Sequence, residues 1–172
     1  NSLSSSIWSS TQTNGLEKDD PNREVIKIIG FQIGLGKRLK WPDDFFTLSQ
    51  NLSLENFNLT NSTSSFTLSD GLSYNYSYNI VIGRNSIDQP TFPRKGSNIS
   101  LSLQLTPPYS LINPKDNIEE LPDEEKFKWV EYHKWKFGAN WFNSFSEKLV
   151  LKTNLEYGLI GMYNKNLGLS PF

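Results

Sequence analysis

The stretch Leu72–Arg84, LSYNYSYNIVIGR, alternates apolar and polar residues almost without exception. One parity carries leucine, tyrosine and isoleucine, and the other carries serine, asparagine and glycine. Because successive side chains of a β-strand point to opposite faces, this period of two predicts a strand with one apolar and one polar face. The predicted strand is much longer than the roughly 5–6 residues usual in globular proteins.

The same alternation recurs along the chain. It is clear in Ile99–Leu105, in Leu149–Leu159 and in Phe31–Lys40, and it is less regular in residues 2–13, 45–59 and 127–142. In 45–59 the parity changes between Leu54 and Phe57, which predicts a β-bulge. The acidic run before Lys126 could start a helical turn, but we expect Pro122 to interrupt it. The sequence therefore predicts an all-β, antiparallel chain of about seven strands.

The predicted connections alternate in length. The long ones are residues 14–24, 60–70 and 106–126, and the short ones are 41–44, 86–96 and 143–147. In an antiparallel meander every second connection lies at the same end, so all long loops project one way. This arrangement is typical of outer-membrane barrels, which have short periplasmic turns and longer outer loops.

Aromatic residues are predicted to gather near both strand ends. The first group, near the short turns, is Trp41, Phe45, Phe46, Phe92, Trp141, Phe142 and Phe145. The second group, near the long loops, is Tyr74, Tyr76, Tyr109, Trp129, Tyr157 and Tyr163. Two such girdles are typical of a membrane barrel, in which they lie at the lipid interfaces. A large soluble β-sandwich also buries aromatic side chains and is the alternative.

Composition excludes several other classes. The 172 residues are 36% hydrophobic with a mean hydropathy of -0.50, and no apolar run approaches the ~18 residues of a membrane helix. Membrane strands stay possible, because only every second residue faces lipid. The net charge of -1 gives no basic footprint for nucleic acid, and the absence of cysteine excludes disulfides and thiolate sites.

The sequence offers no catalytic constellation, and we expect neither an enzyme nor a cofactor or metal site. His133 is the only histidine, which we interpret as a solvated surface residue. Asp43 and Asp44 follow a proline, as is typical of turns. The segment GLGKR, residues 34–38, lacks the spacing and the helix of a phosphate loop. We interpret its glycines as small residues on the polar face of a barrel strand.

One connection carries a stiff turn followed by a regular strand. Pro90 and Pro93 fix φ and remove backbone donors, and Gly96 can adopt a positive φ just before the next strand. The surrounding segment RNSIDQPTFPRKGS, residues 84–97, resembles the turn between two mid-barrel strands in the BamA family of outer-membrane assembly factors. The residues that match this turn, which we carry over as structural residues only, are Arg84, Asp88, Pro90, Phe92, Pro93 and Gly96.

Other stretches, in the same order, are similar to the Bacteroidetes branch of that family. They are GKRLKWPDDFFTL (36–48), QLTPPYSL (104–111), KWVEYHKWKF (128–137) and LGLSPF (167–172). The resemblance covers nearly the whole chain and is weakest over residues 1–24. It implies a partial transmembrane β-barrel, in which residues 1–172 form about seven strands, roughly the fifth to eleventh, of a parent sixteen-stranded barrel domain. The family's POTRA domains, first strands, last strands and loop-tip motif are absent from this stretch.

Physical reasoning also predicts an incomplete barrel. Single-chain bacterial barrels usually have an even number of strands. Two unpaired strand edges in lipid would leave backbone groups unsatisfied at a cost of several kcal/mol each.

The resemblance implies a function as part of an assembly factor that folds and inserts β-barrel proteins into the bacterial outer membrane. Its partners would be unfolded outer-membrane proteins as clients, lipoproteins of the assembly machinery and outer-membrane lipid, with no nucleic acid. The mechanism that the resemblance implies is physical: a weakly closed seam of the parent barrel offers strand edges as a template for incoming strands, and this stretch would supply the rigid back wall. The polar face, which we expect to line a wet lumen, carries Gln32, Arg38, Asn75, Asn79, Gln104, Lys134, Lys136, Asn140, Lys152 and Glu156.

Several alternatives stay open. A TamA-like assembly factor or a secretion transporter would share the same superfamily barrel, and a passive porin would need an open, conducting lumen. A soluble β-sandwich that binds carbohydrate would place its aromatic residues on one patch instead of in two belts. A hydrolase of the outer-membrane phospholipase kind would need His133 beside a nucleophilic serine on the same face.

Overall fold

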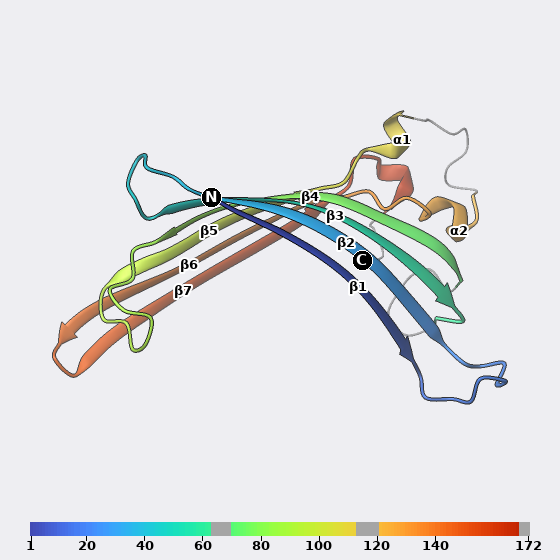
Figure 1. Cartoon of the computed structure of the whole chain (residues 1–172), viewed down its shortest axis with the longest axis horizontal. Helices are drawn as coiled ribbons and strands as arrows, with labels where there is room; N and C mark the ends of the chain where they lie inside the picture. Colours follow the sequence, from blue (N-terminus) through green and yellow to red (C-terminus); the bar gives the residue numbers. More distant parts are fainter. Residues whose placement is uncertain (63–69, 113–120, 169–172) are drawn as a thin grey trace.

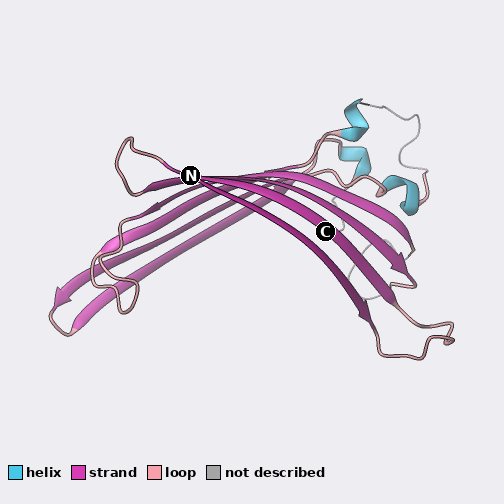
Figure 2. Cartoon of the chain, in the orientation of Figure 1, coloured by secondary structure: helices cyan, strands magenta, loops and turns pink. Residues whose placement is uncertain are grey.

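Seven antiparallel strands form one open sheet in the order of the sequence (Figures 1 and 2). The computed structural model describes residues 1–62, 70–112 and 121–168. The strands are β1 (Ser2–Thr13), β2 (Val25–Arg38), β3 (Phe46–Thr60), β4 (Gly71–Asn85), β5 (Gly96–Leu105), β6 (His133–Ser146) and β7 (Leu149–Gly161). Three short helical segments are α1 (Tyr109–Ile112), α2 (Asp123–Lys126) and the 3-10 helix η2 (Lys165–Leu167). The predicted all-β antiparallel meander of seven strands is confirmed.

The sheet is not closed. Within the described ranges, β1 pairs only with β2 and β7 pairs only with β6, so each has one free edge. Figure 2 shows a single twisted layer, with the helical segments gathered beyond one end of the strands. In the part of the chain that the structure describes, no helix combines the length and apolar character needed to cross a membrane.

Successive connections lie at opposite ends of the sheet, as predicted. Residues 39–45, 86–95 and 147–148 lie at one end of the sheet, and the described residues 14–24, 61–62, 70, 106–112 and 121–132 lie at the other (Figure 1). Their lengths alternate less regularly than predicted, because the connection 86–95 has as many residues as the one between Thr60 and Gly71. The last short turn has only two residues, because β6 continues through Ser146. The long connection before β6 extends to residue 132, because β6 begins only at His133.

The register confirms the two-faced pattern. Residues directly opposite each other on neighbouring strands share a face, and Leu54 lies opposite both Phe31 and Tyr76 on the apolar face. All ten residues predicted for the polar face lie together on the other one, where Asn79, for example, is opposite Gln104. Trp8 is an apolar exception on the polar face, and its ring covers Gly30, where an added Cβ would lie 2.1 Å from its Cε2 atom.

Large side chains of the apolar face are exposed. Ile33 is 39% exposed, Leu52 is 43%, Leu101 is 42% and Leu155 is 52%, and these residues come from four different strands. The largest apolar patch on a typical soluble monomer covers only about 300–600 Å². An apolar face that continues across long neighbouring strands therefore requires a covering, either lipid or protein.

The predicted bulge in β3 is wrong. The pairing of β3 with both neighbours runs without a register shift through residues 54–57. Phe57 and Leu59 instead lie on the polar face, where they are buried. The register shift that the structure does contain lies in β6 between Ser144 and Ser146, with Phe145 as the extra residue.

Candidate functional site

The connection between β5 and β6 folds back over the polar face at the long-loop end. We call its described second part, residues 121–132, the cap. The backbone N–H of Tyr74 donates to the carbonyl of Lys128 at 2.8 Å, and the N–H of Val130 donates to the carbonyl of Tyr74 at 3.0 Å. The cap thus extends the edge of β4 beyond the point where β5 ends, with Trp129 bridged in parallel to Tyr74.

The buried apolar residues of the described chain gather mainly at this end of the sheet. They are Phe57, Leu59, Phe127, Val130, Tyr132 and Leu167, with Ala139 the exception in β6. Ser73 is fully buried on β4, and its hydroxyl donates to the carbonyl of Phe127 at 2.8 Å. The cap and the polar face therefore form a small core, which accounts for the inward parity of Phe57 and Leu59.

A polar network joins the cap to the strands below it. The Tyr132 hydroxyl lies 3.3 Å from the Asn75 side-chain oxygen, to which it donates, and it accepts from the Gln104 amide at 2.8 Å. Asn75 in turn donates to the carboxylate of Glu55 at 3.0 Å. Burial raises the pKa of Tyr132, so its hydroxyl keeps its proton at neutral pH and serves as a donor.

Both ends of this connection are fastened. At its start, the Thr106 N–H donates to the Tyr132 carbonyl at 3.1 Å, and the Tyr132 N–H donates to the Thr106 hydroxyl oxygen at 2.7 Å. Glu131 is buried, and its carboxylate accepts from both the N–H and the hydroxyl of Ser110 in α1. These bonds hold the two described parts of the connection, residues 106–112 and 121–132, to each other.

Replacing Ser73 by alanine tests this attachment. We expect Ser73→Ala to lower the free energy of unfolding by about 1–2 kcal/mol, because it leaves the buried carbonyl of Phe127 without this donor. The matched control is Ser102→Ala, whose hydroxyl donates to Asn79 in a more accessible site and should cost less than about 0.5 kcal/mol. Urea titration in detergent measures both changes, and equal losses would contradict a special role of the cap.

An aromatic cluster marks the outer edge of the cap. The Trp129 ring centroid lies 4.8 Å from that of Tyr74, 5.5 Å from that of Tyr76 and 4.8 Å from that of Tyr109. These four residues belong to the group predicted near the long loops. Tyr76 lies on the apolar face, opposite Leu54, so the cluster borders that face.

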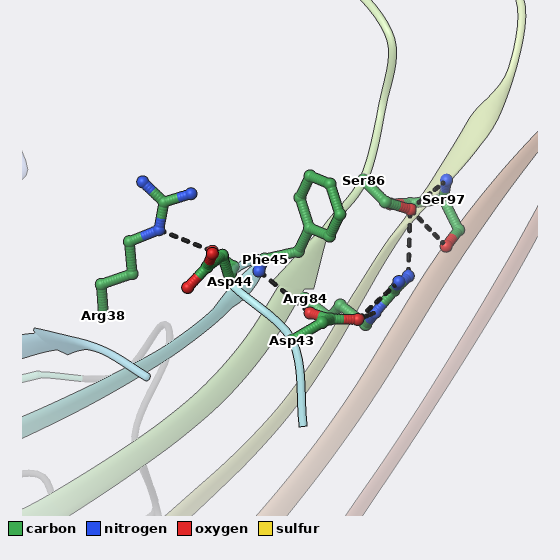
Figure 3. A network of polar contacts seen from close by, with 7 residues as sticks. All are labelled: Arg38, Asp43, Asp44, Phe45, Arg84, Ser86 and Ser97. Atoms are coloured by element: carbon green, nitrogen blue, oxygen red, sulfur yellow. Dashed lines mark hydrogen bonds and ion pairs between the residues drawn. The ribbon is translucent and has the colours of Figure 1, made fainter. Parts of the chain in front are cut away.

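The short-turn end forms a connected rim, which we define as residues 37–45, 84–96 and 145–149. Arg84 joins two of its segments (Figure 3): its Nη2 lies 2.8 Å from Asp43 Oδ2, and its Nη1 donates to the Ser86 hydroxyl at 3.0 Å. Arg38 donates to the carbonyl of Asp44 in the same turn at 2.6 Å. Although partial desolvation acts against it, hydrogen bonding from Arg84 and from the Phe45 N–H, together with the Arg84 charge, lowers the pKa of Asp43.

The predicted turn residues lie in this rim. Asp88 accepts from the N–H groups of Gln89 and Arg94, each at 3.0 Å, and these bonds close the turn around Pro90 and Pro93. Phe92, at the tip, has φ +54° and an exposed side chain, and its carbonyl accepts from the Gln89 amide at 2.9 Å. Gly96 has φ +103°, the positive value expected from the sequence.

Arg94 was not singled out in the sequence, yet it connects neighbouring hairpins. Its guanidinium donates to the carbonyls of Ser146 and Glu147 at 2.8 and 2.5 Å and to the Ser144 hydroxyl at 3.1 Å. Asp43 was interpreted only as a turn residue, and its ion pair with Arg84 was also missed. Each contact joins segments distant in the chain, and no local pattern signals it.

The acid dependence of the turn follows from Asp88. The Arg94 N–H is the main cause that lowers the pKa of Asp88 below its ordinary 3.8, with the N–H groups of Lys95 and Gln89 adding to it against slight desolvation. A carboxylate with a lowered folded pKa stabilises the fold above its unfolded pKa and loses this effect as pH falls through the folded value. Between about pH 5 and about pH 2, we expect the urea midpoint to fall further in the wild type than in Asp88→Asn. Parallel pH profiles would contradict this role.

His133 lies at the start of β6 and makes several side-chain contacts. The ring of His133 is partly exposed, packs against Tyr163 at 5.5 Å between centroids, covers Gly161 and accepts from the Trp135 indole at 3.3 Å. In the described ranges, no group of three or more His, Cys, Asp or Glu side chains could hold a metal ion.

The glycines of segment 34–38 lie on the polar face, as expected. A Cβ on Gly34 would lie 2.3 Å from the side-chain oxygen of Asn51 and 2.7 Å from the Ser4 hydroxyl, so the glycine makes room for side chains of both neighbouring strands.

Neither a protein-family model nor a curated protein sequence matches this chain.

Proposed function

We propose that this chain forms part of the wall of an outer-membrane β-barrel, with its apolar face toward lipid and its polar face toward the lumen. The observation that carries the proposal is the exposed apolar face, which crosses long strands while the opposite face is polar. A membrane-spanning strand needs about 9–11 residues. The strands of this sheet have 10 to 15 residues, which meets this requirement.

The free edges of β1 and β7 support the same proposal. In lipid, exposed backbone N–H and C=O groups cost several kcal/mol each, so membrane sheets close into barrels. Further strands of the same barrel would pair with both edges and complete a closed wall. A sheet with one apolar and one polar face, open at both edges, fits a section of such a wall.

We further propose that the parent barrel belongs to the BamA family and folds and inserts other β-barrel proteins into the outer membrane. The support is the series of motifs, above all the turn with Asp88, Phe92, Pro93 and Gly96, each of which occupies a defined position in the rim. Clients would be unfolded outer-membrane proteins, and assembly lipoproteins would be partners. We propose no chemical step, because the strand edges of the factor act only as a template for the strands of the client.

This section would serve as the rigid back wall. The rim fastens adjacent turns through Arg84 and Arg94, and the cap fastens the opposite end through Ser73 and Tyr132. A firmly held wall would leave strand opening to a seam elsewhere in the barrel. A TamA-like factor or a secretion transporter could use the same wall.

Two other candidates fit less well. A passive porin needs an open lumen, whereas the cap covers part of the polar face. A soluble β-sandwich needs two sheets packed face to face, whereas the described strands form a single sheet.

The barrel proposal is tested with the full-length protein from its natural source. We expect it to require detergent and to migrate faster in gels when unheated than when boiled, because a closed barrel resists unfolding. A monomer that dissolves in plain buffer and shows no heat shift would overturn the proposal.

The insertion proposal has its own experiment. Vesicles that contain the full-length protein should accelerate the folding of an unfolded outer-membrane protein, measured by the heat shift of that client. Vesicles with an unrelated barrel of similar size are the control. Equal rates would reject the assembly function and leave the barrel proposal intact.

A further inference from the structure

The two ends of the sheet differ in charge. The rim carries seven basic and four acidic side chains. The described residues of the long-loop end carry nine acidic and five basic side chains, counted over residues 14–24, 61–62, 70, 106–112, 121–132 and 162–168. The chain is close to neutral as a whole, so its charge is separated along the strand direction.

Two of the four acidic side chains of the rim are already engaged within the protein. Asp43 pairs with Arg84, and Asp88 accepts backbone N–H groups. Lys40, Lys95 and Lys148 are exposed, and within the described ranges none of them forms an ion pair with a carboxylate. One lysine comes from each turn, so three cations on one rim are available to an external anion.

Exposed aromatic side chains accompany these lysines. Trp41 is 83% exposed, Phe92 is 86% and Phe145 is 69%, again with one from each segment of the rim. Phe92 is held at the tip of its turn with a positive φ. Aromatic rings favour the boundary between lipid and water, and lysines near a membrane surface are attracted to anionic headgroups.

We propose that the rim binds an anionic phospholipid surface, with Lys40, Lys95 and Lys148 near the headgroups and Trp41, Phe92 and Phe145 at the boundary of the acyl chains. This inference rests on the proposed membrane barrel, because the rim then lies at one bilayer surface. Charge complementarity selects anionic over zwitterionic lipid. The acidic opposite end would be repelled from the same surface, so the lipid would also favour one orientation of the barrel.

The test uses the full-length protein in mixed micelles of uncharged detergent with either phosphatidylglycerol or phosphatidylcholine. Lipid retained per protein after gel filtration is measured by mass spectrometry. We expect preferential retention of phosphatidylglycerol, which weakens as salt increases. The triple variant Lys40→Gln, Lys95→Gln, Lys148→Gln should lower the apparent affinity for phosphatidylglycerol about 100-fold.

A second triple variant serves as the matched control. Lys18→Gln, Lys128→Gln, Lys165→Gln removes the same charge from exposed positions at the long-loop end and should leave retention unchanged. The heat shift confirms that each variant is folded, and if the rim triple fails to fold, the three single variants replace it, each with a loss of about fivefold.

The possible outcomes separate the two proposals. Equal retention of both lipids by a heat-shifting wild type, or equal behaviour of the two triple variants, would overturn the lipid inference alone. Absence of a heat shift in the wild type would overturn the barrel and, with it, the lipid inference.

Discussion

Gly96→Ala is expected to lower the free energy of unfolding by about 2–5 kcal/mol, one of the two largest effects predicted for this chain. An added Cβ would lie 2.1 Å from the carbonyl oxygen of Ser86 and 2.8 Å from its carbonyl carbon. The value of φ, +103°, is also one that residues with a side chain rarely adopt. Both the steric overlap and the strained φ involve backbone atoms, which cannot move aside as the end of a flexible side chain can.

The consequence would spread into the sheet. The Ser86 N–H donates to the carbonyl of Ser97 at 2.8 Å, directly beside Gly96, at the start of the β4–β5 ladder. A shift of Ser86 would disturb this bond and the adjacent Arg84 contact. Urea titration of the folded protein in detergent measures the loss.

Gly158→Ala is the matched control for this substitution. Gly158 also lies in the sheet, but its added Cβ would come no closer than 3.9 Å to another atom, the Trp135 carbonyl oxygen. We expect a change within about 0.5 kcal/mol at this position. If both alanine variants were equally stable, the turn would not depend on the geometry of Gly96.

Local periodicity explains how much of this fold could be predicted. In runs such as the one that ends at Arg84, apolar and polar residues alternate at successive positions. The sequence alone therefore predicts both the strand and the face on which each side chain lies. The predicted face was wrong for Phe57 and Leu59. These two side chains lie on the polar face because the cap, a segment about seventy residues later in the chain, covers them there. An apolar residue that breaks the alternation is interpreted as a sign of a β-bulge unless the segment that covers it is known.

The rim shows the same limit for the candidate site. The positive φ of Gly96 could be predicted, because a glycine after a proline-rich turn is a local signal. The bond from Arg94 to Glu147 could not, because it depends on two hairpins lying side by side. Trp8 is a similar case, since its place on the polar face depends on the open space above Gly30 in the next strand.

Leu101→Arg is expected to destabilise the protein by about 2–4 kcal/mol when it is folded in phosphatidylcholine vesicles. Leu101 lies in the middle of β5 on the apolar face, between Ile82 and Phe137, and is 42% exposed. If lipid covers this face, the substitution places a charge near the centre of the bilayer. The free energy of unfolding in vesicles, from denaturant titration, gives the cost.

The adjacent residue provides the control, because successive residues of a strand face opposite ways. Ser100 lies on the polar face between Gly83 and Gly138 and lines a shallow hollow with Lys136 and Glu156. Ser100→Arg should cost less than about 1 kcal/mol, since the two glycines leave room and the hollow is open to water.

The comparison of the two arginine variants separates the possible environments of the sheet. A large cost for Leu101→Arg alone requires an apolar medium on one face and water on the other, as the wall of a membrane barrel has. No cost in either variant would place water on both faces and reject lipid as the covering. Similar costs in both variants would mean that arginine destabilises β5 on either face. The cost for Leu101→Arg would then give no support for lipid on the apolar face.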